Sequence, residues 1–262
     1  MNYDNIILEK KGVIAMLTLN RPEKLNAINE KMLGDLENAV VKISRDRDIR
    51  VLIITGAGRA FCSGADVGDM AKSATGSIMQ IRHWTQAAHK IILTITELEK
   101  PVIAKVNGLA VGIGCSLALS SDVIFASEEA EFSLIFSRIG LIPDGGALFH
   151  LPRLVGLAKA KELILTARRV NAKEAERIGL IYKAVPANDL GNHVTAFTTE
   201  LANGPTLAYG LAKKIMNKGL SMDLSSVLEW EASGQALAGT TEDAREGIMA
   251  FLEKRKPRFK GI

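Results

Sequence analysis

The sequence predicts an α/β protein in which a core of strands and helices is followed by a helical C-terminal region. Apolar runs of strand length alternate with helix patterns over residues 13–126. Helix patterns alone follow over residues 158–254, and this segregation favours an α/β core with a helical appendix. An Asn-Gly-Pro break at 203–205 predicts the boundary. We therefore expect a core unit of residues 1–202 and a helical unit of residues 203–262.

The core elements follow from hydrophobic spacing and from the signals at their ends. Residues 13–19 form a short apolar run that ends at an N-R-P-E turn, which predicts a strand. Asn29 precedes apolar residues at helical spacing, so we expect a capped helix over residues 30–44. The other expected core elements are strands over 51–55, 101–106 and 123–126, and helices over 78–97 and 115–119.

After Pro152 the patterns become helical. The expected helices cover residues 158–166, 172–178, 190–202, 206–217, 224–237 and 241–254. Apolar residues within 229–237 and 248–252 are ones that a monomer leaves exposed, which indicates contacts between subunits.

Composition and charge narrow the class of protein. The 262 residues are 47% hydrophobic and 24% charged, as is typical of a globular protein, and the net charge of +4 suits a small anionic ligand rather than a nucleic acid. Cys62 and Cys115 form no C-x-x-C pair, so we expect two buried free thiols and no metal site. The longest charge-free run, residues 106–121, is broken by glycines and too short to span a bilayer. With no leader-like N-terminus, we expect a cytoplasmic protein that binds no membrane.

Two glycine-containing segments follow predicted strands. Residues 59–66 (R-A-F-C-S-G-A-D) follow the strand over 51–55, and residues 107–115 (N-G-L-A-V-G-I-G-C) follow the strand over 101–106 and open a helix. Backbone N–H groups at such places attract negative charge, and two converging amides would form an oxyanion hole. Each segment taken alone is also consistent with an ordinary tight turn.

A third segment, residues 139–146 (I-G-L-I-P-D-G-G), holds the candidate base. The acidic residues between Val106 and His150 are Asp122, Glu128, Glu129, Glu131 and Asp144. Among them, only Asp144 lies in an apolar context, where desolvation would raise the pKa of its carboxyl towards that of a useful base. The alternative is a turn aspartate that bonds its own backbone.

These segments resemble the crotonase family, the enoyl-CoA hydratase/isomerase superfamily. The resemblance runs from N-R-P-E-K-L-N-A-I (20–28) through A-F-C-S-G-A-D (60–66) and K-P-V-I-A-K-V-N-G-L-A-V-G-I-G (100–114) to R-E-G-I-M-A-F-L-E-K-R-K-P-R-F (245–259). It implies a core built as a spiral of ββα turns, a helical C-terminal region for trimerisation and acyl-CoA thioester substrates. The partners it implies are an acyl-CoA and further copies of the chain, as a homotrimer or a dimer of trimers. No cofactor is implied apart from the coenzyme A of the substrate, and no metal.

The resemblance also implies roles for individual residues. The oxyanion amides are those of Ala65 and Ile113. Most members have glycine at the second position, and since isoleucine tolerates a positive φ badly, we expect a helical φ at Ile113. The residues implied to bind the acyl-CoA are Lys24, Leu25, Ala27, Ser63, Gly64, Ala65, Asp66, Val67, Gly112, Ile113, Gly114, Phe136 and Pro143. Phe251 and Lys254 match residues that reach the coenzyme A of a neighbouring subunit, although the basic end could also be merely solvated.

The sequence departs from the family's hydratases at both catalytic glutamates. Ser116 and Phe136 occupy those positions. Addition of water needs one group to activate the water and another to deliver a proton, so these residues disfavour hydration, which stays an alternative.

Asp144 favours isomerisation instead. Residues 136–146 and 151–156 resemble the 1,2-epoxyphenylacetyl-CoA isomerase group of the family, in which an aspartate at this position does the work. One carboxylate suffices to take a proton α to the thioester and return it at the γ carbon. Our leading hypothesis is a Δ3,Δ2-enoyl-CoA isomerase or a related ring-acyl-CoA isomerase; aliphatic and aromatic acyl groups are both open.

Two further alternatives stay open. Asp144 and His89 match the aspartate and histidine of the family's 4-chlorobenzoyl-CoA dehalogenases, although His89 is also consistent with a partly exposed helix histidine. A non-catalytic acyl-CoA binder is the third possibility, motivated by the loss of both glutamates.

Overall fold

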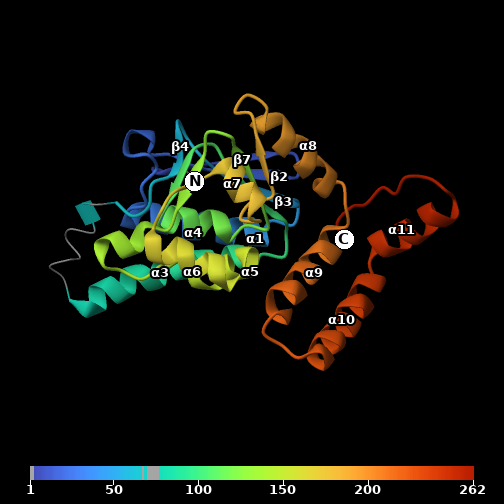
Figure 1. The fold of residues 1–262 in the computed structure, drawn as a ribbon. Helices are drawn as coiled ribbons and strands as arrows, with labels where there is room; N and C mark the ends of the chain where they lie inside the picture. Colours follow the sequence, from blue (N-terminus) through green and yellow to red (C-terminus); the bar gives the residue numbers. More distant parts are fainter. Residues whose placement is uncertain (1–2, 67, 70–76) are drawn as a thin grey trace.

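The computed structural model describes residues 3–66, 68–69 and 77–262, and it contains two sheets with helices packed beside them (Figure 1). The larger sheet has the order β1-β2-β3-β5-β7-β10, and the smaller one the order β4-β6-β8-β9. The strands are β1 (Ile6–Lys11), β2 (Ile14–Leu19), β3 (Val51–Gly56), β4 (Ala60–Cys62), β5 (Val102–Val106), β6 (Leu109–Val111), β7 (Val123–Ser127), β8 (Glu131–Ser133), β9 (Val170–Asn171) and β10 (Lys183–Val185).

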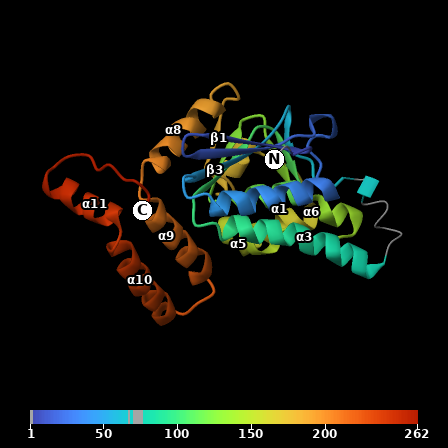
Figure 2. The same ribbon diagram turned by 180° about the vertical axis from the view of Figure 1, so that it is seen from behind.

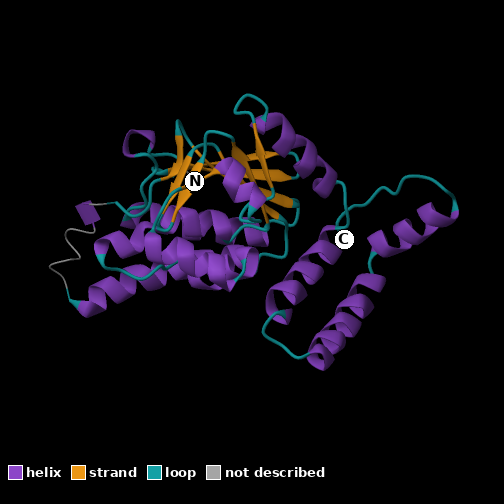
Figure 3. Cartoon of the chain, viewed as in Figure 1, coloured by secondary structure: helices purple, strands orange, loops and turns teal. Residues whose placement is uncertain are grey.

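Successive turns of the chain give one strand to each sheet and then a helix. β3, β4 and α3 (Ile78–Thr96) form one such turn, and β5, β6 and α4 (Ile113–Leu119) form the next. The strands that follow one another in each sheet are parallel, while β1 is antiparallel to β2 and β9 to β8. The predicted ββα spiral is therefore confirmed. Figure 3 shows the strands gathered above a layer of helices.

The remaining helices are α1 (Glu30–Arg45), α5 (Ala147–Val155), α6 (Leu157–Thr166), α7 (Ala172–Arg177), α8 (Leu190–Ala202), α9 (Thr206–Gly219), α10 (Leu224–Gly239) and α11 (Glu242–Leu252), with short 3-10 turns η1 (Pro22–Lys24) and η2 (Ile135–Ile139). The predicted cap is present, since the Asn29 side chain accepts a hydrogen bond from the Met32 amide. The expected helices were all found, with ends shifted by up to about two residues, as is usual for helix boundaries.

Two apolar clusters hold the core together. The larger lies between the sheets and the helices and includes Leu17, Phe61 and Phe132. The second lies on the other face of the large sheet, where Ile103 and Phe125 pack against Val194 and other residues of α8. The central strands are buried on both faces, which explains why their sequences are continuous apolar runs.

The C-terminal helices attach to the core through α9. The Lys213 Nζ lies 2.8 Å from the Asp122 carboxylate and also donates to the Ile95 carbonyl. Gly210 meets the Glu99 backbone so closely that a Cβ at Gly210 would lie 2.5 Å from the Glu99 carbonyl oxygen. From there α10 and α11 extend away from the core (Figures 1 and 2).

Several elements differ from the expectation. The strands β1, β4, β6, β8, β9 and β10 were not predicted, because β1 is a largely exposed edge and the others have only two or three residues each. The helix α5 was missed because Pro152 was taken as a break; it continues to Val155, held by the buried Ala147 and Leu151.

The two cysteines and the lengths of the apolar helices bear on two further expectations. Cys62 and Cys115 are both free and buried, as predicted, and burial raises the pKa of each thiol to about 12. Within the described ranges, no helix is both long and apolar enough to cross a membrane.

Candidate active site

The two glycine-containing segments lie side by side. A Cβ at Gly112 would lie 3.8 Å from the Gly64 Cα, and a Cβ at Gly64 would lie 3.2 Å from the Val111 carbonyl oxygen. Both glycines have positive φ, 107° at Gly64 and 55° at Gly112, where a residue with a side chain would be strained. Segments about fifty positions apart in sequence thus meet at one place.

The amides of Ala65 and Ile113 border this contact. Ile28 donates to the Gly64 carbonyl and accepts from the Asp66 amide, so in this parallel bridge the Ala65 N–H points away from Ile28. Ile113 is the first residue of α4, and such an N–H has no acceptor within its helix. Because Gly112 carries the positive φ, Ile113 keeps an ordinary backbone conformation, as expected. Such amides could together bind an oxyanion.

The segment that contains Asp144 packs against the same helix, α4. The Ser116 Oγ donates to the Asp144 carbonyl at 2.8 Å, and a Cβ at Gly145 would lie 3.2 Å from the Ile113 Cγ1. Phe136 is also near, since a Cβ at Gly112 would lie 3.9 Å from its Cζ. All three sequence segments that predicted chemistry therefore converge around the start of α4.

The Asp144 carboxyl is partly buried. Burial raises its pKa, whereas the charge of His89 and the residue's own backbone amide act to lower it. Its Oδ1 atom is buried without a hydrogen-bond partner within the described part of the chain. Two interpretations of Asp144 were open, and each has support. Burial supports a desolvated carboxyl, and the bond to its own amide supports a turn aspartate. An unpaired carboxyl of this kind is suited to take up and release a proton.

Two histidines approach the Asp144 segment. His89 is exposed on α3, close enough for its charge to act on the Asp144 carboxyl. His150 packs beside Gly146, where a Cβ would lie 3.2 Å from its Cδ2. Burial and the Arg153 charge lower the pKa of His150 to about 4, so its ring is neutral near pH 7. Sequence reasoning missed His150, although its spacing of one helical turn from Gly146 was a usable signal.

The loop with Lys24, Leu25 and Ala27 is held against the first amide segment. Leu25 and Asn26 have φ of 51° and 58°, an unusual conformation for residues other than glycine. The buried Asn26 side chain stabilises it by accepting from the Arg21 amide and donating to the carbonyls of Ala57 and Ala60. The exposed Lys24 stands at the edge of this loop.

Direct bonds join this loop to residues 63–66. The Ser63 amide donates to the Leu25 carbonyl, and its hydroxyl donates to the Lys24 carbonyl. Arg21 donates to the Ala27 carbonyl at 2.7 Å and pairs with the Asp66 carboxylate at 2.9 Å. That guanidinium lowers the pKa of the Asp66 carboxyl. The Asp66 carboxylate is thus held in an ion pair, which disfavours a role as a general base.

Some predicted site residues lie elsewhere. Phe251, which is 83% exposed, lies at the end of α11 and Lys254 just beyond it, and α11 extends away from the core in both views (Figures 1 and 2). Within one chain they do not join the site. Val67 lies outside the described residues. Gly114 is buried in α4, where a Cβ would clash with Cys62, and Pro143 is buried directly before Asp144.

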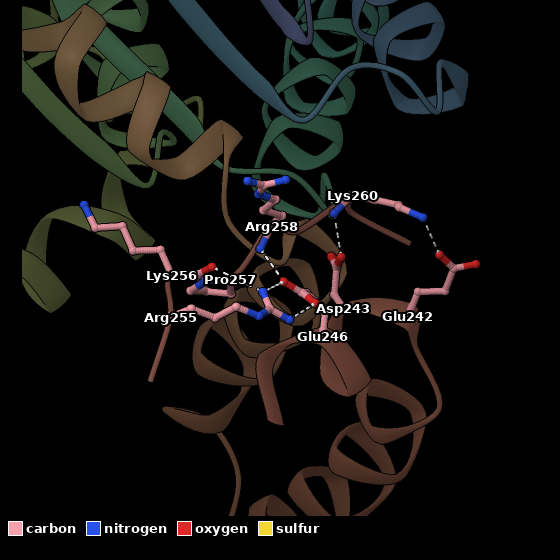
Figure 4. Close-up of a pocket in the computed structure, with 8 residues that line it drawn as sticks. All are labelled: Glu242, Asp243, Glu246, Arg255, Lys256, Pro257, Arg258 and Lys260. Atoms are coloured by element: carbon pink, nitrogen blue, oxygen red, sulfur yellow. Dashed lines mark hydrogen bonds and ion pairs between the residues drawn. The ribbon is translucent and has the colours of Figure 1, made fainter. Parts of the chain in front are cut away.

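A cavity of about 750 Å³ lies far from this site, between α11 and the C-terminal tail (Figure 4). Several charged side chains that line it are already engaged. Glu246 pairs with Arg255, and Asp243 accepts hydrogen bonds from the backbone amides of Lys260 and Gly261. These bonds fasten the tail. Within the described ranges, no group of three or more His, Cys, Asp or Glu side chains could hold a metal ion.

Comparisons with known proteins find relatives along nearly the whole chain. The profile of the family described as enoyl-CoA hydratase/isomerase matches residues 9–262. A crotonyl-CoA hydratase of Syntrophomonas wolfei is 40% identical over 260 residues, with 99% of each chain covered. A 1,2-epoxyphenylacetyl-CoA isomerase of Escherichia coli is 39% identical over 253 residues, with 96% of each covered. The crystal structure of an enoyl-CoA hydratase from Bacillus anthracis superposes with a TM-score of 0.93 at 34% identity, covering 99% of this chain and 100% of that one.

Proposed function

Because this chain belongs to the enoyl-CoA hydratase/isomerase family, we propose that it is an isomerase that moves the double bond of an enoyl-CoA from Δ3 to Δ2. The observation that carries the proposal is Asp144. Its segment packs on α4 beside Ile113, and its Oδ1 has no hydrogen-bond partner among the described residues, whereas Asp66 is paired with Arg21. By the resemblance to the family's hydratases, Ser116 and Phe136 stand where those enzymes have their two glutamates.

In the proposed reaction, the thioester oxygen binds the N–H groups of Ala65 and Ile113. The Asp144 carboxylate removes a proton from the α carbon, and the developing enolate charge is stabilised by the two amides. The resulting carboxylic acid returns the proton to the γ carbon, while the double bond moves into conjugation with the thioester. One carboxyl performs both steps, so no second acid or base is required.

Hydration is the second candidate, and the names of the relatives favour it, since hydratases outnumber isomerases among them. The chemistry of the site favours it less. The Ser116 hydroxyl already donates to the Asp144 carbonyl, and Phe136 has no group that exchanges protons. Asp144 would therefore have to act alone on both water and substrate.

One observation favours the dehalogenase alternative: His89 lies close enough for its charge to act on the Asp144 carboxyl. The mechanism needs a histidine that activates water near the aspartate that attacks the ring. Release of chloride from 4-chlorobenzoyl-CoA is the assay that distinguishes it. A binder without activity would hold acyl-CoA tightly and turn over neither substrate.

We propose that binding and assembly follow the family pattern. The loop around Lys24 and Ala27 would bind the coenzyme A, and Phe251 and Lys254 would reach it from a neighbouring copy. Phe251 and Lys254 are exposed and lie away from the core of their own chain, which supports this assembly. We expect a homotrimer or a dimer of trimers that binds no nucleic acid; light scattering should give at least three times the 28.2 kDa of one chain.

The role of Asp144 is tested by Asp144→Asn, with Asp48→Asn as control because that side chain is 82% exposed. Loss of a general acid–base should lower the rate of Δ3 to Δ2 isomerisation by about 10²–10⁴-fold. Binding of a saturated acyl-CoA, followed by calorimetry, should stay within about twofold since the amides are intact. An Asp144→Asn enzyme with wild-type isomerisation would show that another group carries the proton.

A further inference from the structure

Ser116 lies between the two halves of the proposed site. It is fully buried on α4, one turn after the residue that offers the oxyanion amide. Its Oγ lies 2.8 Å from the Asp144 carbonyl oxygen and 3.3 Å from the Gly112 carbonyl oxygen. A hydroxyl has a single hydrogen, and the shorter distance assigns it to Asp144.

The segment after Asp144 is packed from two sides. A Cβ at Gly145 would lie 2.8 Å from the Ser116 Cβ, and one at Gly146 would lie 3.2 Å from the His150 ring. Both glycines have positive φ. Packing therefore limits how far the segment can move towards α4 or α5, but packing alone is not directional. The Asp144 carbonyl accepts from the Ala147 amide at 3.2 Å and, at the shorter distance of 2.8 Å, from Ser116, so the bond from Ser116 ties the orientation of this peptide group to α4.

Apart from the residue's own backbone amide, little else orients the carboxyl. The buried Asp144 Oδ1 has no hydrogen-bond partner among the residues that the structure describes. Its direction must then depend on where the Asp144 backbone is held. The same helix, α4, carries Ile113 at its first position and Ser116 one turn later.

We propose that Ser116 is a positioning residue, which holds the Asp144 backbone so that the carboxylate faces the substrate carbons while Ile113 binds the thioester oxygen. One rigid helix thus sets the distance between the base and the oxyanion hole. The inference rests on the proposed function. It also means that Ser116 is not the group that delivers a proton, because its single hydrogen is already donated to the Asp144 carbonyl.

The test compares Ser116→Ala with Ser120→Ala. Ser120 is a matched control, because it is buried at the end of the same helix and its Oγ donates to the Leu117 carbonyl at 2.8 Å, away from Asp144. We expect Ser116→Ala to lower kcat for 3-hexenoyl-CoA isomerisation by about tenfold or more, since small misplacements are costly in rate. KM should stay nearly unchanged. Ser120→Ala should keep kcat.

Two readouts separate positioning from general destabilisation. The acid limb of the pH–rate profile should move to lower pH in Ser116→Ala alone, because a loosened carboxyl is better solvated. In the Asp144→Asn background, Ser116→Ala should cause little further loss of rate, as expected when one residue acts through the other. Equal kcat and pH profiles in Ser116→Ala and wild type, or independent losses in the double variant, would overturn the proposal.

A second assay keeps the two proposals apart. Exchange of the α proton of butyryl-CoA in D₂O, followed by mass spectrometry, requires the base and the oxyanion hole but no double-bond shift. Exchange without isomerisation in the wild type would end the isomerase proposal, and a slower exchange in Ser116→Ala would still support positioning. Exchange that is unaffected by Ser116→Ala would contradict it, and a wild type with neither activity would overturn both.

Discussion

At the scale of the residue, the proposed chemistry depends on one carboxyl group that is partly removed from water. Burial withdraws water from Asp144, and its Oδ1 receives no hydrogen bond from the described residues. By contrast, Asp66 nearby is paired with Arg21 and has a lowered pKa. Two aspartates near one site thus differ in role because their surroundings move their pKa values in opposite directions.

The first prediction concerns the pH dependence of the isomerase. Only the ionised Asp144 can accept the α proton, and its pKa is raised above the ordinary aspartate value. The value of kcat/KM should therefore rise with pH through an apparent pKa above that of a free aspartate, when measured between about pH 4 and pH 8. A profile that is flat in this range would mean that Asp144 is not the base.

The second prediction concerns stability. Because folding raises the Asp144 pKa, the ionised carboxyl disfavours the folded state above that pKa, whereas below the ordinary value both states are protonated and the penalty is absent. Asp144→Asn should therefore raise Tm near pH 7 and raise it less at about pH 4. The Asp48→Asn control should show no such pattern. A lower Tm for Asp144→Asn near pH 7 would contradict the account.

At the scale of the element, α4 organises the site. Its first residue offers an amide, its second turn holds the Asp144 segment through Ser116, and Gly145 packs on it. The short helix is wholly buried, so it is a rigid support for groups that come from three segments.

The third prediction compares two glycines with positive φ. Gly145→Ala would place a Cβ 2.8 Å from the Ser116 Cβ, whereas around Gly140 a Cβ meets nothing within 4 Å. Gly140→Ala should cost about 1–2 kcal/mol from backbone strain alone. Gly145→Ala should cost more, by about 1–3 kcal/mol, and should also lower kcat. Chemical denaturation measures both; equal losses would show that the close approach is unimportant.

The elements also show what the sequence can and cannot predict. Helices such as α1 and α8 were found because many apolar residues repeat at helical spacing. The strand β4, A-F-C, has no period to detect, since it exists only through pairing with β6. The amide segments and Asp144 were identified by resemblance and local context. The bond from Ser116 to Asp144 joins residues 28 positions apart, and its geometry exists only in the folded chain.

At the scale of the whole molecule, the helical C-terminal region depends on a few polar contacts with the core. The Lys213 ammonium is buried and pairs with the Asp122 carboxylate, whose side chain is 25% exposed; desolvation lowers the pKa of Lys213 and raises that of Asp122. Arg50 adds bonds from the core to the carbonyls of Ala202 and Phe259. Beyond these contacts, α10 and α11 present exposed apolar side chains that include Leu228, Leu237 and Ile248, which suits the proposed assembly.

The fourth prediction compares two adjacent lysines of α9. Lys213→Ala removes a buried ammonium and leaves the Asp122 carboxylate with the Val102 amide alone among the described residues, and should lower the free energy of unfolding by about 1–3 kcal/mol. Lys214→Ala removes an exposed pair with Glu99 and should cost less than about 1 kcal/mol. Urea denaturation measures both variants. Losses below about 1 kcal/mol in both variants would mean that the pair of Lys213 with Asp122 does not anchor α9.

The measurement that tests the central claim most directly is a paired assay of the purified protein. One sample receives trans-3-hexenoyl-CoA and is followed for the appearance of the conjugated 2-enoyl product; the other receives crotonyl-CoA and is followed for loss of conjugation by hydration. The account predicts isomerisation without comparable hydration, since Asp144 is the one proton carrier proposed for the site. Rapid hydration of crotonyl-CoA with little isomerisation would contradict it.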